Sequence, residues 1–399
     1  MPEAVIVATA RTPIGRANKG SLVDCRPDDL SALIIKTVVA QVPKLDPAQV
    51  EDVIWGCGQP AGEAGYNVGR VAAILADIDV PGVTVNRYCS SSLQTIRMAA
   101  HAIKAGEGDV FIAGGVETVS RFMNGMSDGG PTNEKFRSAR SRSKEREAGG
   151  QPKWTPPQGL PDVYIAMGQT AENVAEAENV AREEMDQFAA LSQQRAVENQ
   201  ENGFFEREIT PVPLADGTLV AKDDGPRAGT TVEKLATLKP VFRPDGTVTA
   251  GNACPLNDGA AAVVVMSDAK ASQLGVKPLA RIVASGVSAL NPEIMGLGPI
   301  EASRQALKRA NLTIDDIDLV EINEAFAAQV IPSAKHLGIP WEKLNVHGGA
   351  IALGHPFGMT GARIMTTLIN GLQTDGKRYG LETMCVGGGQ GMAMIVERL

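Results

Sequence analysis

The side chains best suited to chemistry are two cysteines and a histidine, each placed where an apolar stretch ends in a turn. Cys89 follows the β-branched run 83–85 and is itself followed by three serines and a helical pattern. His355 lies between glycine and proline, and Cys385 stands just before a run of three glycines. A thiolate at a strand–turn–helix junction is stabilised by the helix dipole and by the free amides of the first turn. We therefore interpret Cys89 as a nucleophile.

A cysteine and a histidine together form the minimal activated nucleophile, because the imidazole can take the thiol proton. Cysteine suits acyl groups that are carried as thioesters, since exchange of one thioester for another is nearly isoenergetic. Cys385, beside glycine amides that could hold an oxyanion, suits proton transfer at carbon. Asn323 follows another strand and is a fourth candidate.

Each of these residues also has an ordinary structural interpretation. The two cysteines could fill the core at strand ends, His355 could be a loop histidine bonded to the backbone, and Asn323 could cap the next helix. Four such residues at four equivalent strand–helix junctions are hard to assign to packing alone. The pattern favours a shared site.

The elements that must position these residues alternate between strands and helices, which predicts a parallel α/β sheet. In the first third we expect strands at 4–9, 53–58, 83–85 and 110–113, and helices at 28–41, 67–76 and 93–105. The last third repeats this plan with strands near 279–287, 318–323 and 382–386 and a helix at 361–372. Two similar halves would bring their reactive loops together at their interface, where a ligand cleft is expected.

The region between the halves has a different composition. Residues 121–159 read as an exposed insertion with a basic run at 135–146, which is either a solvated surface or a contact with a phosphate group or a subunit. Helices are expected at 168–181 and 182–202, followed by an Asp/Gly/Pro-rich stretch at 211–250 and a strand at 260–266.

Composition excludes several classes of protein. A net charge of −8 over 399 residues argues against nucleic acid as the main partner. The five cysteines are odd in number, spread out and never spaced as C-x-x-C, so neither a metal site nor a disulfide framework is expected. The longest apolar runs are far shorter than the ~20 residues of a membrane span. With no signal peptide expected at the N-terminus, the expected location is the cytoplasm.

Seven stretches together identify the sequence as resembling the thiolase family, the acetyl-CoA acetyltransferases and 3-ketoacyl-CoA thiolases. The resemblance runs from end to end and is more specific than any single motif. The stretches are Asn86–Gln94, Met167–Asn173, Gly251–Ala253, Asn257–Ala261, Asn323–Ala327, Gly348–Pro356 and Cys385–Gly389.

The resemblance implies a duplicated thiolase fold in the α/β class, with two βαβαβαββ halves layered α/β/α/β/α and an inserted loop domain. The expected division is 1–120 plus 251–270 for the first half, 121–250 for the loop domain and 271–399 for the second half. It implies no covalently bound cofactor, with coenzyme A and acyl-CoA as substrates, and assembly as a homodimer or homotetramer. The implied activity is reversible Claisen condensation and thiolysis in fatty-acid or related lipid metabolism, including β-oxidation.

The resemblance also implies a role for each residue of the site. Cys89 would carry the acyl group, His355 would activate it, and Cys385 would exchange the α-proton of the second acyl-CoA. Asn323 would hold a water that forms one oxyanion hole with His355, and the amides of Cys89 and Gly387 would form the other. The expected coenzyme A contacts are Arg227, Met167, Phe326 and the position of Cys254.

Two positions depart from the pattern of many biosynthetic members. Cys254 stands where they have a serine that bonds the pantetheine, and Ala166 stands where they have a histidine. Both changes concern the coenzyme contacts and the acyl-group preference, and the four catalytic positions are untouched. Two other functions are kept open separately. The first is a decarboxylating ketoacyl synthase, which would not need Cys385, and the second is a non-catalytic thiolase-fold protein that binds CoA esters or lipids. Oxidation of the cysteine pair to a disulfide would be inactivation or regulation.

Overall fold

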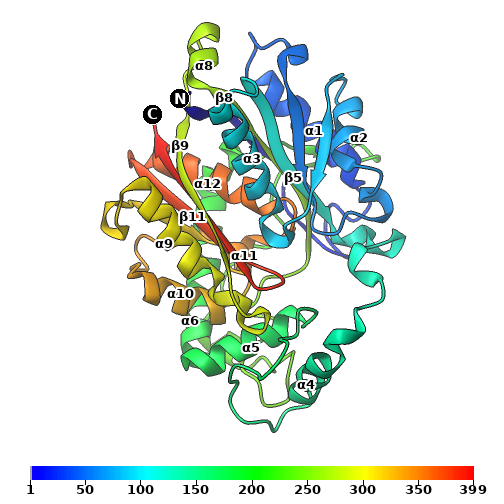
Figure 1. The fold of residues 1–399 in the computed structure, drawn as a ribbon, viewed down its shortest axis with the longest axis vertical. Helices are drawn as coiled ribbons and strands as arrows, with labels where there is room; N and C mark the ends of the chain where they lie inside the picture. The colour runs from blue at the N-terminus through cyan, green and yellow to red at the C-terminus, as the bar shows by residue number, and fades with distance from the viewer. Residues whose placement is uncertain (1) are drawn as a thin grey trace.

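The strands form two similar sheet halves with helices on both faces (Figure 1), in a computed structural model that describes residues 2–399. In the first half the order is β4–β3–β5–β8–β1, and in the second it is β10–β11–β12–β9. β3 runs parallel to β4 and β5, β10 runs parallel to β11, and the remaining pairs of these strands are antiparallel. The strands are β1 (Ala4–Arg11), β3 (Asp52–Gly56), β4 (Gly82–Val85), β5 (Val110–Thr118), β8 (Asn257–Ser267), β9 (Ala280–Ala289), β10 (Leu319–Ile322), β11 (Tyr379–Val386) and β12 (Gln390–Arg398).

The internal repeat expected from the sequence is visible in this strand order. Reading outward from the junction, β9–β12–β11–β10 corresponds to β1–β8–β5–β3. The counterpart of β4 is reduced to one parallel bridge between Val320 and Leu344. The two halves meet where β1 pairs with β9 over only two residue pairs, Val5 with Arg281 and Ile6 with Ala280. The duplicated α/β fold is confirmed, but the prediction of a parallel sheet is wrong, because β8, β1, β9 and β12 pair with their neighbours in antiparallel fashion.

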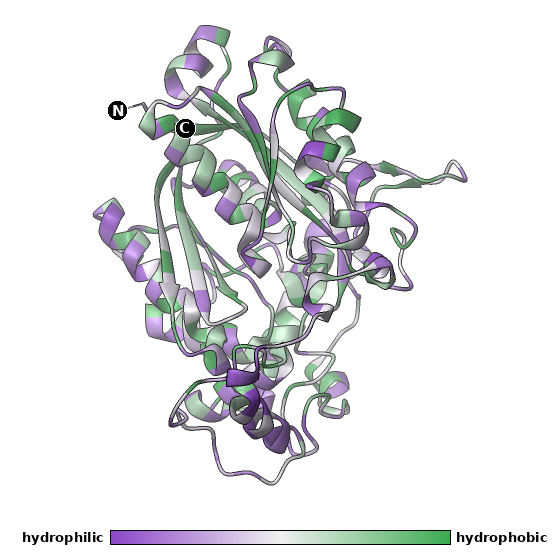
Figure 2. Ribbon diagram, turned by 45° about the vertical axis from the view of Figure 1, so that its right-hand side comes forward, coloured by the Kyte–Doolittle hydropathy of each residue, from purple (hydrophilic) through white to green (hydrophobic). Residues whose placement is uncertain are grey.

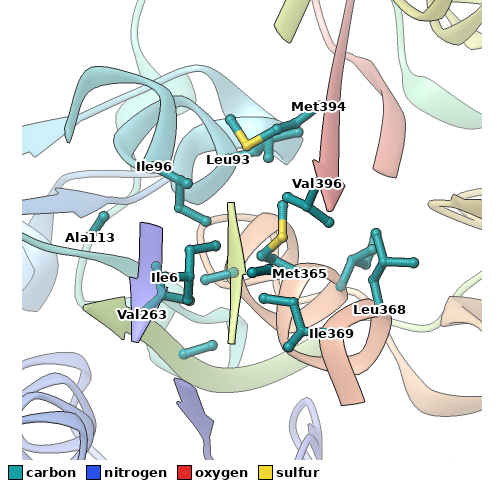
Figure 3. Close-up of a cluster of buried hydrophobic side chains, with 14 of the residues drawn as sticks. Ile6, Leu93, Ile96, Ala113, Val263, Met365, Leu368, Ile369, Met394 and Val396 are labelled. Atoms are coloured by element: carbon teal, nitrogen blue, oxygen red, sulfur yellow. The ribbon is translucent and has the colours of Figure 1, made fainter. Parts of the chain in front are cut away.

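The middle layer consists of α3 (Ser91–Ala105) and α12 (Thr360–Thr374), which lie between the two sheet halves. Both helices have apolar side chains on several faces because both are covered on more than one side. Figure 3 shows how the side chains of these helices meet those of the strands: Leu93 and Ile96 from α3, Met365, Leu368 and Ile369 from α12, and Ile6, Val263, Met394 and Val396 from the sheets. This is the core that sets the relative position of the halves.

Gly361 allows α12 to approach α3 closely. A Cβ atom built on Gly361 would lie 2.3 Å from the backbone nitrogen of the buried Leu93. Backbone atoms of a packed helix cannot move aside easily, so we expect Gly361→Ala to lower the free energy of unfolding by about 1–3 kcal/mol. Denaturant unfolding followed by circular dichroism measures this change. Gly130→Ala is the control, because a Cβ there meets nothing within 4 Å, and an equal loss in both variants would contradict the prediction.

The outer faces of the sheet halves are covered by separate helices. On the first half lie α1 (Pro27–Ala40) and α2 (Val68–Leu75). Proline at the first position of α1 and two aspartates in its first turn favour a helix start there. On the second half lie α9 (Gly298–Ala310) and α10 (Ala327–Leu337). The remaining short elements of the halves are β2 (Gly15–Arg16), α8 (Asp268–Leu274) and α11 (Ala350–Leu353).

Between β5 and β8 the chain leaves the sheet, and the longer helices of this segment lie in the lower part of the molecule in Figure 1. The helices expected at 168–181 and 182–202 are α5 (Met167–Glu178) and α6 (Arg182–Glu201). The other elements are α4 (Arg137–Glu147), α7 (Val232–Ala236) and the hairpin β6 (Val212–Pro213) with β7 (Leu219–Val220). None of the helices in residues 2–399 is long and apolar enough to cross a membrane.

The basic run at 135–146 forms much of α4, which is strongly hydrophilic in Figure 2 and buries only Ala139. All four of its arginines nevertheless form bonds within the chain, and two of them reach partners outside the segment 132–147. Arg146 bonds the Glu176 carboxylate of α5, and Arg142 donates to the backbone oxygen of Leu160 at 2.7 Å. Part of the basic run therefore fastens α4 to its neighbours.

Candidate active site

Cys89 lies in a sharp turn between β4 and α3. The turn is a short 3-10 helix, Tyr88–Ser90, and Tyr88 has a left-handed backbone with φ +44°. The Asn86 side chain accepts a bond from the Tyr88 amide at 2.8 Å. The Ser91 hydroxyl accepts from the Arg87 amide at 2.9 Å and donates to the Tyr88 carbonyl at 2.7 Å. These local bonds hold the strained turn and place the cysteine at the start of a helix, as the sequence predicted.

The glycine run after β11 reaches the same place from the other half. The Gly387 amide hydrogen-bonds the Cys89 sulfur and favours its thiolate form, but burial outweighs this and raises the pKa of the Cys89 thiol to about 11. Gly388 and Gly389 both have positive φ values, of 77° and 80°, which glycine adopts at little cost. Cys89 is thus a neutral thiol at rest, with a backbone donor already directed at its sulfur.

The bonding of His355 determines which ring nitrogen is free. Its Nδ1 lies 2.6 Å from the Thr360 hydroxyl, which donates its single proton to the Pro356 carbonyl at 2.7 Å. We therefore assign the proton to Nδ1, and Nε2 is left to accept. Burial lowers the pKa of His355 to about 3, with a smaller effect from the positive charge of Arg363. The imidazole is neutral and can serve as a base.

Asn323 completes this side of the site. It follows β10, and its Nδ2 lies 3.3 Å from Nε2 of His355. Its backbone oxygen accepts a bond from the Gln329 side chain at 2.7 Å, which fixes its orientation. Within the described residues, its own Oδ1 is buried and has no hydrogen-bond partner. A buried amide oxygen in this condition is available to hold a water or a ligand.

Three of the thiols influence one another. Burial is the main cause that raises the pKa of Cys385 well above its ordinary value, and the charges of Cys89 and Cys254 add to it. Burial likewise raises the pKa of Cys254, with contributions from Cys89 and Glu324. These effects place Gly387, Cys385 and Cys254 near Cys89, and a hydrogen bond joins Asn323 to His355.

The remaining predicted contacts are spread around this group. Phe326 is buried, forms a bridge with Ala253 next to Cys254, and packs edge-on against Phe242 with ring centroids 6.0 Å apart. Met167 is the first residue of α5 and is half-buried against the same apolar cluster. Arg227 lies at the surface, where it lines a cavity of about 600 Å³ together with residues of α6.

Sequence reasoning missed two residues that position His355. Thr360 fixes the tautomer, and the Asn257 side chain accepts a bond from the His355 amide at 2.9 Å. The only signal for Thr360 is its place five residues after the histidine, at the start of a helix. Asn257 lies in one of the seven stretches that resemble thiolases. It is 98 residues from the histidine in sequence, so the sequence does not predict the contact.

A third residue that was missed is the buried Glu117 at the end of β5. Its carboxylate accepts bonds from the amides of Gly58 at 2.8 Å, Gln59 at 3.2 Å and Gly358 at 2.9 Å. Burial raises its pKa to about 7, against the effect of these amides. It ties the loop after His355 to the end of β3.

These pKa values predict how Cys89 reacts with iodoacetamide. Only the thiolate is alkylated, and for a pKa near 11 its fraction grows about tenfold per pH unit. We expect the alkylation rate of Cys89, followed by mass spectrometry of its peptide, to rise in this way from pH 6 to pH 9. A short blocked peptide with one cysteine is the control, and its rate should rise by clearly less than tenfold per unit above about pH 8, because its pKa is about 8.5. A plateau for Cys89 below pH 8 would reveal a preformed thiolate–imidazolium pair and contradict the assignment.

Comparison with known proteins shows the family of the chain. Residues 4–269 match the family model described as thiolase, N-terminal domain, and residues 276–398 match thiolase, C-terminal domain. The chain is 46% identical over its full length to all of a β-ketoadipyl-CoA thiolase of Acinetobacter baylyi, and 44% identical to all of a 3-ketoacyl-CoA thiolase of Vibrio vulnificus.

A solved structure gives the same result for the fold. The acetyl-CoA acetyltransferase of Bacillus anthracis superposes with a TM-score of 0.87 and 39% identity, and the match covers 100% of this chain and 99% of that one. Within residues 2–399, no group of three or more His, Cys, Asp or Glu side chains is placed to hold a metal ion. With both family models matched across nearly its whole length, the chain belongs to the thiolase family.

Proposed function

We propose that this acyltransferase works by a ping-pong reaction in which Cys89 carries the acyl group as a thioester. The observation that supports this most directly is the Gly387 amide directed at the Cys89 sulfur. A donor in that position also lies close to where the oxygen of a thioester on Cys89 would develop negative charge. Coenzyme A thioesters are the substrates that the family uses.

In the first half-reaction, Nε2 of His355 accepts the proton of Cys89. The thiolate attacks the carbonyl carbon of the incoming acyl-CoA, and the amides of Cys89 and Gly387 hold the oxyanion. When the tetrahedral intermediate collapses, the C–S bond to coenzyme A breaks and the coenzyme leaves with a proton from His355. The neutral state of the imidazole suits this role, because it begins the cycle as an acceptor.

In the second half-reaction, Nε2 of His355 takes the thiol proton of Cys385, and the Cys385 thiolate removes the α-proton of acetyl-CoA. The enolate oxygen is held by the protonated Nε2 of His355 and by a water on Asn323, and the enolate carbon attacks the thioester on Cys89. The new C–C bond gives 3-ketoacyl-CoA and frees the Cys89 thiolate, which regains a proton from His355. Thiolysis is the reverse sequence.

We assign the coenzyme contacts to Arg227, Met167, Cys254 and Phe326. The cavity beside Arg227 suits a nucleotide, and the apolar surroundings of Met167 and Phe326 suit the pantetheine and acyl chain.

We also propose the division into a first half at 1–120 plus 251–270, a loop domain at 121–250, and a second half at 271–399. The large exposed side chains of Tyr66 and Met123 support assembly as a homodimer or homotetramer. Five free cysteines fit a reducing compartment, and we propose the cytoplasm.

The test is kcat/KM for thiolysis of 3-ketoacyl-CoA substrates of graded length, with a dicarboxylic substrate, 3-oxoadipyl-CoA, in the series. The names of the relatives suggest both types of substrate. Turnover with formation of acetyl-CoA is expected for at least one of them. Binding without turnover would favour a CoA-ester or lipid-binding protein instead. A requirement for malonyl-CoA would favour a decarboxylating ketoacyl synthase.

A further inference from the structure

We propose that Arg87 and Gln390 act together as positioning residues that hold the Gly387 amide against Cys89. The inference rests on the proposed function, because it concerns the donor that stabilises the oxyanion during acyl transfer. Neither side chain needs to touch the substrate. They would act through the backbone of the glycine loop, and so determine how well the oxyanion donor is aligned.

A chain of two hydrogen bonds connects the turn of Cys89 to the glycine loop. Nη1 of Arg87 donates to Oε1 of Gln390 at 2.8 Å, and Nε2 of Gln390 donates to the carbonyl oxygen of Gly387 at 3.4 Å. The backbone amide of Arg87 donates to the Ser91 hydroxyl, which lies in the same turn as Cys89. The two residues lie 303 positions apart, one in each half of the fold.

The glycine loop needs such a connection more than other turns do. Three successive glycines, 387–389, separate β11 from β12, and glycine has the greatest backbone freedom of any residue. Gln390 closes the turn by pairing with Val386 across the two strands. Its side chain then returns to Gly387, the residue whose amide faces the thiol. One side chain thus restrains the most flexible part of the site.

Arg87 has no other evident role among the described residues. It is half-buried, burial lowers the pKa of its guanidinium, and no carboxylate of residues 2–399 forms a salt bridge with it. Its Nε is buried without a hydrogen-bond partner. Partial burial of a cation without a paired anion lowers the stability of the fold, so we expect Arg87 to have a functional role. The one side-chain hydrogen bond that it forms within the described chain leads to Gln390 and so to the glycine loop.

The experiment measures the single-turnover rate of Cys89 acetylation by acetyl-CoA, with rapid quenching and mass spectrometry. The variants are Arg87→Gln, Gln390→Ala, their double variant and the conservative Arg87→Lys. Because loss of a whole oxyanion donor costs about 10²–10³-fold, we expect misalignment to slow acetylation about tenfold in each single variant. KM should stay within about twofold of wild type, since substrate binding is untouched.

Comparing the acetylation rates of further variants distinguishes a positioning role of the two residues from a general loss of stability. If the residues act as one unit, the double variant should be no slower than the slower single variant. Arg87→Lys, which keeps a cationic donor, should recover most of the rate. Arg97→Gln is the control, because Arg97 is also half-buried, has no salt bridge within the described residues and bonds only Ser285. It should acetylate at the wild-type rate, and thermal unfolding midpoints should be recorded for all variants.

Each outcome distinguishes the two proposals. A wild-type enzyme that forms no acetyl adduct on Cys89 would refute the proposed function. A normal wild-type adduct with unchanged rates in the variants would refute only the positioning role. Losses that multiply in the double variant, or that appear equally in Arg97→Gln together with lower unfolding midpoints, would also overturn it.

Discussion

Cys89→Ala is expected to remove acetylation of the enzyme and to lower kcat/KM for thiolysis by about four orders of magnitude or more. Without the sulfur there is no covalent intermediate, and the remaining oxyanion donors can only assist a direct reaction between two coenzyme A thioesters. Mass spectrometry after brief exposure to acetyl-CoA checks the first part, and a thiolysis assay checks the second. The side chain is nearly buried but small, so the fold should persist.

The matched control for this variant is Cys25→Ala, which removes a half-buried cysteine outside the site. It should retain wild-type acetylation and turnover. Acetylation of another residue in Cys89→Ala, with turnover preserved, would mean that the nucleophile lies elsewhere.

Cys385→Ala is expected to separate the two half-reactions. Formation of acetyl-Cys89 needs His355 and the Gly387 amide but no proton transfer at carbon, so its rate should stay within about tenfold of wild type. Condensation and thiolysis should fall by about 10²–10⁴-fold, the range for loss of a general acid or base. Single-turnover acetylation and steady-state thiolysis on the same preparation measure the two effects.

An equal loss of both steps in Cys385→Ala would contradict the division of roles between the thiols. Met384→Leu offers a control for disturbance of the strand. Met384 neighbours Cys385 but packs in the central core on the other side of β11, and the exchange nearly conserves volume. It should leave both rates close to wild type.

The fold was largely predictable because its signals are local. Apolar runs bounded by glycine mark β1, β3 and β5, and the apolar periodicity of 28–41 marks α1 to within a residue at each end. The basic α4 was harder, since a helix with a single buried residue has no apolar stripe to reveal it. Its internal bonds from Arg142 and Arg146 depend on tertiary contacts with α5 and the following loop.

The candidate site was predictable in its reactive groups but not in what orients them. Cysteine, histidine and asparagine stand out because their chemistry is rare at strand ends. Asn257 and Glu117 act through hydrogen bonds across large sequence separations, 98 residues for Asn257 and His355 and 241 for Glu117 and Gly358. Thr360 lies only five residues from His355, but its residue type alone does not reveal its bond to the ring. Such contacts leave no periodicity or spacing to read. The same holds for the bond between Arg87 and Gln390.

The close contact at Gly361 makes α3 and α12 behave as one rigid frame. One helix begins just after the nucleophile, and the other begins a few residues after the histidine that serves it. Widening that contact by even part of an ångström would move Cys89 and His355 relative to each other, and a misplacement of 1 Å can cost about 10²-fold in rate. A change in the spacing of the two helices should therefore alter the catalytic rate more than it alters the thermal unfolding midpoint. Glycine at position 361 therefore sets the reaction geometry as well as the packing of the two helices.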